Sequence, residues 1–273
     1  MKKIIIFIVV IFCLIVVGYF AFNDNQKSSN SYIIGADTTF PPFEYEEDGQ
    51  LKGFDIDIIN AIAKKENLKI TIQAMQFSGI IPGLQGGTID AAVAGITIKQ
   101  ERSKVVNFSD AYYKSGLSIL VKKDSRIGGV NDLNGQIVAT KKATSSVDYL
   151  RNNKNIKPQQ ILQFDNIVDA YNVLLSDGAN AVLFDNPVNL NFIAQGDNAS
   201  QYKIVGPLLT GEYYGIAISQ KNPELLAKIQ RGLKAIQADG SYARIYKKYF
   251  GDNPSGMVLT AISPQQAINM SHS

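Results

Sequence analysis

The sequence contains one cysteine and one histidine, and this scarcity excludes several classes of functional site. A lone Cys13 cannot form a disulfide within the chain, and one cysteine with one histidine cannot build a metal cage. The only histidine, His272, is the next-to-last residue, which leaves no credible Ser-His-Asp or Cys-His catalytic system. We therefore expect neither a metal nor another cofactor.

The sequence also lacks a basic tract. The formal net charge is +3, and Lys2 and Lys3 supply two of those charges. Nucleic acid is therefore not an expected partner. The length of 273 residues allows one large domain or two ordinary ones, and 45% hydrophobic residues is an ordinary share for a globular protein.

Residues 4–22 form the one long stretch without a charged residue, and Lys2 and Lys3 precede it. This order is typical of an export signal whose N-terminus stays in the cytoplasm. The stretch is close to the ~20 residues that span a bilayer, so it predicts either a signal peptide or an N-terminal membrane anchor. Cys13 follows Phe12 and is a poor lipidation site. Residues 23–31 read as a linker, and the rest is expected to work outside the cytoplasm.

After the linker, strand and helix patterns alternate in two successive series. The first ends with the helix pattern "KQERSKVVN", and the second begins near Val121. Successive β-α-β units predict two α/β lobes with largely parallel sheets. Ligands of such sheets bind beyond the carboxyl ends of the strands, so we expect a cleft between the lobes. The residues after Gly251 are weakly patterned and are expected to be loose.

The stretch "AGITIKQERSKVV" raises the question of whether Arg102 faces solvent or a ligand. Thr97 and Gln100 have the spacing of a capping box, which predicts a helix that begins just after the apolar "AAVAG". The first-turn amides of this helix would favour an anion. From one turn further in, Arg102 would reach back and grip a carboxylate with two parallel hydrogen bonds. The alternative is an ordinary solvated arginine.

Other charged and aromatic residues fall at equivalent strand ends. Each has a structural alternative: a helix cap for Asp185, a solvated loop for Lys141, and core packing for the phenylalanines. Their joint occurrence instead favours a site in which carboxylates, cations and helix N-termini meet in one cleft. The residues concerned are Asp37, Phe40, Phe43, Phe77, Lys141, Ser145 and Asp185.

Four segments carry a resemblance to a known family. The sequence similar to it spans roughly Tyr32 to Gly251. It resembles the extracytoplasmic solute-binding proteins of polar amino-acid ABC importers (family 3), and among them most closely the glutamine-binding proteins. The segments are "GADTTFPPFEY", "GFDIDIINAIAKK", "FSGIIPGLQGGTIDAAVAGITIKQERSKVVNFSDAYYKSG" and "YARIYKKYFG".

The resemblance implies an α/β, type II periplasmic-binding-protein fold with a ligand cleft between two lobes. A hinge of two strands is expected near "YYKSG" and "TGEYY". Lobe 1 is expected to comprise residues 31–111 and 215–251, and lobe 2 residues 117–209, followed by a loose tail at residues 252–273. A monomer is expected.

The resemblance also implies a ligand set on residues already singled out. Arg102 and the amides of Thr97 and Ser145 would hold the ligand α-carboxylate. Asp185 and the Gly95 carbonyl would hold the α-ammonium. The side chain would lie between two aromatic rings, and its tip would reach a charged pair. These four residues are Phe40, Phe77, Asp37 and Lys141.

The charged pair favours glutamine among polar amino acids. Asp37 accepts hydrogen bonds and Lys141 donates them, which matches the NH2 and C=O of a carboxamide. A glutamate side chain offers only acceptors and would face Asp37 unfavourably. Two departures from the glutamine-binding pattern are Phe184, where those proteins carry a histidine, and "KKATSS", where they have a glycine-rich turn. Another polar amino acid is the alternative ligand.

The implied function is delivery of the amino acid to the transmembrane subunits of an ABC permease. One alternative on the same fold is a cyclohexadienyl-type dehydratase that uses Asp37 or Asp185 as its acid. Arg102 and Lys141 argue against it, because nearby cations are expected to keep those carboxylates ionised. The other alternative is a ligand-sensing domain with a separate signalling partner.

Overall fold

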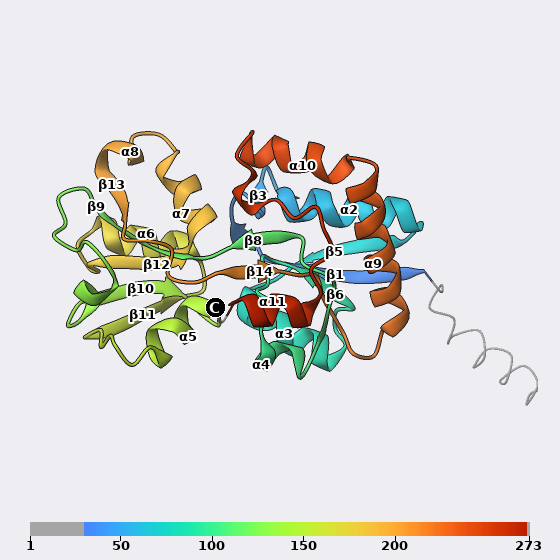
Figure 1. Cartoon of the computed structure of the whole chain (residues 1–273), viewed down its shortest axis with the longest axis horizontal. Helices are drawn as coiled ribbons and strands as arrows, with labels where there is room; N and C mark the ends of the chain where they lie inside the picture. Colours follow the sequence, from blue (N-terminus) through green and yellow to red (C-terminus); the bar gives the residue numbers. More distant parts are fainter. Residues whose placement is uncertain (1–29, 272–273) are drawn as a thin grey trace, which may run out of the picture.

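The computed structural model describes residues 30–271, which form two α/β lobes joined by a pair of strands (Figure 1). The predicted signal or anchor at residues 1–22 and most of the linker lie outside the described residues. In the part of the chain that is described, no helix combines the length and the apolar character that a membrane crossing requires.

Lobe 1 contains a five-stranded sheet in the order β5-β1-β6-β15-β7. Strand β1 pairs in parallel with β5 and β6, whereas β15 pairs antiparallel with β6 and β7. The sheet is therefore mixed. Strand β15 is antiparallel because the chain enters it from the hinge, on the side of the sheet where β1 and β6 end. The strands are β1 (Ser31–Ala36), β5 (Lys69–Ala74), β6 (Ala91–Val93), β7 (Asn107–Phe108) and β15 (Ala217–Ile218).

Lobe 1 also contains a small antiparallel sheet and several helices that precede the C-terminal tail. Helix α2 buries Phe54, Ile58 and Ile62, the face that the sequence pattern predicts. The small sheet consists of β2 (Thr39–Phe40), β3 (Glu44–Glu47) and β4 (Gln50–Lys52). The helices are α2 (Phe54–Glu66), α3 (Phe77–Gly86), α4 (Gln100–Ser103), α9 (Pro223–Ala238) and α10 (Ser241–Phe250).

Lobe 2 repeats this plan with a sheet in the order β11-β10-β12-β9-β13. Strand β10 is parallel to β11 and β12, and β9, which follows the hinge, is antiparallel to β12 and β13. The strands are β9 (Leu117–Lys122), β10 (Ile137–Lys141), β11 (Gln160–Phe164), β12 (Ala181–Asp185) and β13 (Tyr202–Val205). The helical segments are η1 (Val130–Leu133), α5 (Ser145–Asn152), α6 (Ile167–Leu175), α7 (Asn186–Ile193) and α8 (Asn198–Gln201).

The hinge consists of β8 (Tyr113–Ser115) and β14 (Glu212–Tyr214), which pair antiparallel and run side by side between the lobes (Figure 1). Both strands lie where "YYKSG" and "TGEYY" predict them. Their aromatic side chains are buried, and Tyr113 stacks on Tyr214 with ring centroids 5.6 Å apart. Phe43 also packs edge-on against Tyr113 at 4.8 Å, which makes it a core residue of lobe 1.

The tail after Gly251 is not loose, contrary to the sequence-based expectation. It forms η2 (Pro254–Gly256) and α11 (Pro264–Ser271), and α11 buries Ala267 and Ile268 against the hinge side of lobe 1. The tail has few apolar residues, so its hydrophobic pattern is weak, but two buried apolar residues are enough for this short helix to pack beside β14.

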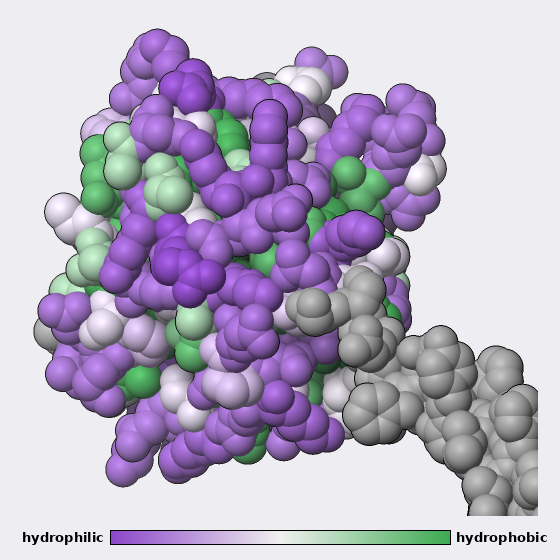
Figure 2. Space-filling view, turned by 90° about the vertical axis from the view of Figure 1, so that its right-hand side faces the viewer, coloured by the Kyte–Doolittle hydropathy of each residue, from purple (hydrophilic) through white to green (hydrophobic). Residues whose placement is uncertain are grey.

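The outer end of lobe 1 is mostly hydrophilic, with apolar residues in small separate areas (Figure 2).

Candidate functional site

The nine residues selected from the sequence line one small cavity between the lobes. It contains about 260 Å³ of space that no protein atom fills. Four of the nine come from strand ends: Asp37 follows β1, Gly95 follows β6, and Lys141 and Asp185 are the last residues of β10 and β12. Convergence of the carboxyl ends of the strands thus brings them together. The lining residues are Asp37, Phe40, Phe77, Ala94, Gly95, Thr97, Arg102, Lys141, Thr144, Ser145, Phe184 and Asp185.

Arg102 is not a solvated arginine. Only 7% of it is exposed, and its guanidinium lies 5.4 Å from the centre of the Phe77 ring. Its Nη1 donates to the Thr97 carbonyl oxygen at 3.0 Å, and its Nη2 donates to the Ala143 carbonyl oxygen of lobe 2 at 3.0 Å. Burial lowers its pKa, while Glu212 and other carboxylates oppose that shift. The guanidinium is thus held within the cleft with further N–H donors to offer.

Thr97 does not cap a helix, so the predicted capping box is wrong. Helix α4 begins at Gln100, its N-cap is Lys99, and no side chain caps it. The Thr97 hydroxyl instead donates to Glu212 Oε2 at 2.9 Å. Helix α4 has only four residues, so the anion-binding character of the site cannot come from its N-terminus. On the other lobe, α5 begins at Ser145.

Asp37 and Lys141 form a buried ion pair across the two lobes. Each side chain is 1% exposed, and Lys141 Nζ also donates to Thr39 Oγ1 at 2.9 Å. Asp37 Oδ1 is buried and has no hydrogen-bond partner among the described residues. The pair therefore presents both an acceptor and a donor to the cavity.

Asp185 also lines the cavity and is bound from the hinge. It is the N-cap residue of α7, but its side chain makes no capping hydrogen bond. The Tyr214 hydroxyl donates to Asp185 Oδ1 at 2.5 Å and also lies 2.8 Å from Ser115 Oγ. The helix-cap interpretation of Asp185 is therefore wrong.

The expectation that nearby cations keep the cleft carboxylates ionised fails for Asp185. Burial raises its pKa from the ordinary 3.8 to about 8, and the negative charge of Glu212 adds to that effect. The Tyr214 hydrogen bond and Arg102 act in the opposite direction but do not outweigh burial.

Glu212 is a site residue that the sequence reasoning missed. It is the first residue of hinge strand β14 and is 5% exposed. Its Oε2 accepts from Thr97 Oγ1 of lobe 1 at 2.9 Å and from Ser145 Oγ of lobe 2 at 3.0 Å. Burial raises its pKa, whereas these two hydrogen bonds and Arg102 lower it. The available signal was a lone acidic residue inside an otherwise apolar predicted hinge strand.

Aromatic side chains form further walls of the cavity. Phe40 packs edge-on against Phe184 across the lobes, with ring centroids 5.6 Å apart. Gly95 has a φ of +51°, and a Cβ there would lie 2.3 Å from Phe40 Cε1. Glycine is therefore required at this turn for both its conformation and its size. Phe184, the departure noted in the sequence, supplies an apolar wall on lobe 2.

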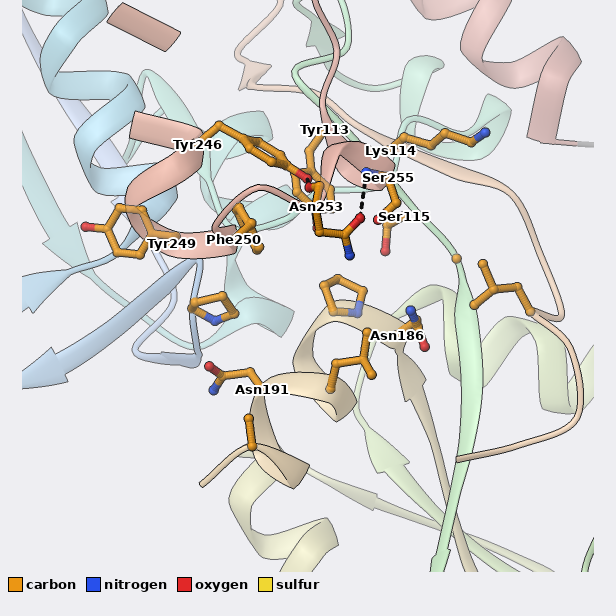
Figure 3. Close-up of a pocket in the computed structure, with 16 residues that line it drawn as sticks. Tyr113, Lys114, Ser115, Asn186, Asn191, Tyr246, Tyr249, Phe250, Asn253 and Ser255 are labelled. Carbon is orange, nitrogen blue, oxygen red and sulfur yellow. Dashed lines mark hydrogen bonds between the residues drawn. The ribbon is translucent and has the colours of Figure 1, made fainter. Parts of the chain in front are cut away.

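A larger hollow, with about 1050 Å³ of space that no protein atom fills, lies beside hinge strand β8 (Figure 3). Tyr246, Phe250 and Asn253 of lobe 1 face Asn186 and Asn191 of lobe 2 across it. Among the described residues that line it, Lys114 carries the only charge. It therefore offers no carboxylate for an ammonium group and is a poorer site for an amino acid than the smaller cavity.

Comparisons with known proteins agree with this geometry. The family model of the bacterial extracellular solute-binding proteins, family 3, matches residues 32–252. The ABC transporter glutamine-binding protein GlnH of Bacillus subtilis (strain 168) is 35% identical over 241 residues, which cover 86% of this chain and 85% of GlnH.

Two solved structures show the same architecture with different ligands. An ancestral arginine-binding protein bound to glutamine has a TM-score of 0.77 and 41% identity, and covers 82% of this chain and 99% of its own. The ancestral arginine-binding protein bound to arginine has a TM-score of 0.76 and 41% identity, and covers 81% and 99%. Similarity alone therefore leaves the ligand open.

Proposed function

Because the chain belongs to the bacterial extracellular solute-binding proteins of family 3, we propose that it is the substrate-binding component of an ABC-type amino-acid importer and that it binds L-glutamine. The ligand lies in the cavity between the lobes, and the closed protein delivers it to the transmembrane subunits of a permease. The likeness to a glutamine-binding relative supports this ligand, and the chemistry of the cavity distinguishes it from its competitors.

The observation that carries the proposal is the charge arrangement along one closed cavity. Arg102, Asp185 and the Asp37–Lys141 pair all line it, and Asp37 pairs with Lys141 across the two lobes. An α-amino acid is a zwitterion, so its carboxylate pairs with Arg102 and the amides of Thr97 and Ser145. Its ammonium pairs with Asp185 and the Gly95 carbonyl. Phe40 and Phe77 then enclose the methylene groups of the side chain.

The Asp37–Lys141 pair selects the side chain. A carboxamide donates to the unpartnered Asp37 Oδ1 and accepts from Lys141. Glutamate would place a second carboxylate against Asp37. Arginine would place a second cation beside Lys141, although Lys141 already neutralises Asp37 in a buried ion pair. Glutamine is therefore the ligand that leaves the fewest buried groups unpaired.

The mechanism follows from contacts that cross between the lobes. Lys141 bonds Asp37, Arg102 bonds the Ala143 carbonyl, and Ser145 bonds Glu212. A ligand that touches both lobes stabilises the closed form by its higher affinity for that form. The permease distinguishes liganded from free protein by this difference in shape.

We place the protein outside the cytoplasm. Lys2, Lys3 and residues 4–22 support export, either with a cleaved signal or with the segment retained as an anchor on the outer face of the cytoplasmic membrane. N-terminal sequencing of the protein from native membranes distinguishes these two forms.

Dehydratase activity is the second candidate, because Asp185 has the raised pKa that a buried acid requires. Incubation with prephenate or arogenate should yield no aromatic product if the protein only binds. Appearance of such a product would replace the binding proposal with an enzymatic one.

Calorimetric titration with a panel of amino acids tests the ligand. The protein should be unfolded and refolded first, because a ligand can copurify. We expect glutamine to bind more tightly than glutamate, arginine, histidine or cystine. A tighter competitor would overturn the reading of Asp37 and Lys141 but would retain the amino-acid head-group site. No binding to any of them would overturn the proposed function.

A further inference from the structure

A second pair of carboxyl groups lies in lobe 1, just behind the cavity. Glu44, the first residue of β3, and Asp55, in the first turn of α2, are both 0% exposed. Both oxygens of Glu44 and Oδ1 of Asp55 are buried, and among the described residues no hydrogen bond to them is formed by an assigned donor. Buried carboxyl groups are costly unless they are neutral or hydrogen-bonded, so this pair requires an explanation.

The two carboxyl groups face each other. The Asp55 backbone N–H donates to the Phe43 carbonyl oxygen at 2.8 Å, which brings the start of α2 against the start of β3. In the described part of the chain, the three buried oxygens of the pair without a partner are both oxygens of Glu44 and Oδ1 of Asp55, and the charge of Asp55 acts on Glu44. Two carboxylates repel each other, whereas a carboxylic acid can donate to a neighbouring carboxylate, so the pair is satisfied when one of the two groups carries a proton.

The proton belongs on Glu44. Asp55 Oδ2 accepts from the Gly95 N–H at 2.9 Å and from the Tyr112 hydroxyl at 2.7 Å, and both donors stabilise a carboxylate. Glu44 has no comparable donor. Burial and the charges of Asp55 and Asp37 raise the Glu44 pKa well above its ordinary value, and Lys141 opposes them only in part. Burial raises the Asp55 pKa less far, to about 6, because its donors oppose the shift.

We propose that Glu44 is a positioning residue for the amino-acid site: it stays a neutral carboxylic acid, donates to Asp55, and so keeps Asp55 bound to the Gly95 N–H. Gly95 is the turn whose carbonyl is assigned to the ligand ammonium, so this role rests on the proposed function. The groups that face Glu44 are Asp55 on α2, Asp37 after β1 and Lys141 on β10, and Tyr112 completes the network through Asp55.

The first test needs no ligand and therefore stands apart from the proposed function. In the wild type, the folded state holds a proton on Glu44 that the unfolded chain releases above its ordinary pKa of 4.5. This contribution to stability is full below that pH and is lost as pH rises toward the folded-state pKa. Glu44→Gln keeps the donor to Asp55 without the titration. Its midpoint of chemical unfolding should rise relative to wild type as pH increases, by a slope of about one proton.

Glu46→Gln is the matched control, because it removes one exposed carboxylate from the same strand. It should follow the wild-type pH dependence. Carbon-13 NMR of glutamate-labelled protein at neutral pH should show a neutral carboxyl signal that Glu44→Gln removes. An identical pH slope in Glu44→Gln and wild type, or the absence of that signal, would overturn the proposal.

The second test concerns the ligand. Glu44→Gln should bind glutamine within about threefold of wild type, because its carboxamide still donates to Asp55. Glu44→Ala leaves Asp55 Oδ1 without a donor and should weaken binding by at least about tenfold. Wild-type affinity in a folded Glu44→Ala protein would show that Glu44 does not position the site.

Discussion

At the scale of single residues, the site depends on charged side chains that are buried between the lobes. Arg102 has two carbonyl partners, one in each lobe, and five N–H donors to share. Its neighbour in the sequence, Glu101, is exposed. Arg102 and Glu101 are adjacent in the same short helix, so a helical sequence pattern alone could not show which of them faces the cleft.

Arg102→Ala is expected to abolish measurable amino-acid binding while the protein stays folded. Truncation of one partner of a buried charge pair costs about 2–5 kcal/mol, which is roughly 30-fold to several thousand-fold in affinity. Arg102→Lys should fail by a similar margin, because an ammonium cannot make two parallel hydrogen bonds to a carboxylate. Calorimetry measures both, and Glu101→Ala provides the exposed control. Near-native affinity in the Arg102→Ala protein would show that Arg102 does not bind the ligand.

The Asp37–Lys141 pair predicts the preference among side chains. Glutamine should bind at least about tenfold more tightly than glutamate, which requires only ~1.4 kcal/mol. Asp37→Asn should narrow that gap, because asparagine donates to a glutamate oxygen and removes the like charge. Lys141→Ala should weaken both ligands, whereas Lys142→Ala, at an exposed neighbour, should weaken neither. Titrations of the wild type and the three variants with both ligands at pH 7 measure these affinities, and an unchanged ratio of glutamine to glutamate affinity in Asp37→Asn would contradict the assignment.

At the scale of elements, the sequence located those site residues whose position follows from topology alone. Asp37, Lys141 and Asp185 end or follow strands, and strand ends converge whatever the side chains do. The predicted capping box at Thr97 is wrong because the Thr97 hydroxyl donates to the Glu212 carboxylate of the hinge instead of capping a helix. Helix α4 begins only at Gln100 and has four residues. Glu212 and Glu44 went unrecognised because their roles arise from partners that are distant in the sequence.

Hinge strand β14 carries a prediction of its own through Glu212. Glu212→Gln retains an acceptor for Thr97 and Ser145 but removes a negative charge near the predicted α-carboxylate, so affinity should be unchanged or increased. Glu212→Ala leaves both hydroxyls without their acceptor and should weaken binding about tenfold. Titration of the two variants decides. Equal affinity in all three proteins would show that Glu212 does not link the lobes.

At the scale of the whole molecule, closure buries two carboxyl groups of like charge. Asp185 and Glu212 lie on lobe 2 and the hinge, and both have raised pKa values in the closed form, chiefly because of burial. A ligand ammonium would compensate Asp185. Without that ammonium, closure is easier when these groups hold protons. The equilibrium between open and closed forms should therefore depend on pH in the free protein and much less in the liganded protein.

The sign follows from the direction of the shifts. Burial between the lobes raises the pKa of Asp185 from the ordinary 3.8 to about 8. We expect opening of the cleft to expose Asp185 and return its pKa toward the ordinary value, so that closing takes up a proton between these values. The closed fraction of ligand-free protein should fall as pH rises from about 4 to about 8. Energy transfer between one fluorescent label on each lobe measures it. Asp185→Asn should flatten the dependence, and saturating glutamine should keep the wild type closed across the range. A closed fraction that rises with pH would contradict this prediction. It would mean that closing releases protons, so that burial of ionised Asp185 does not oppose closure.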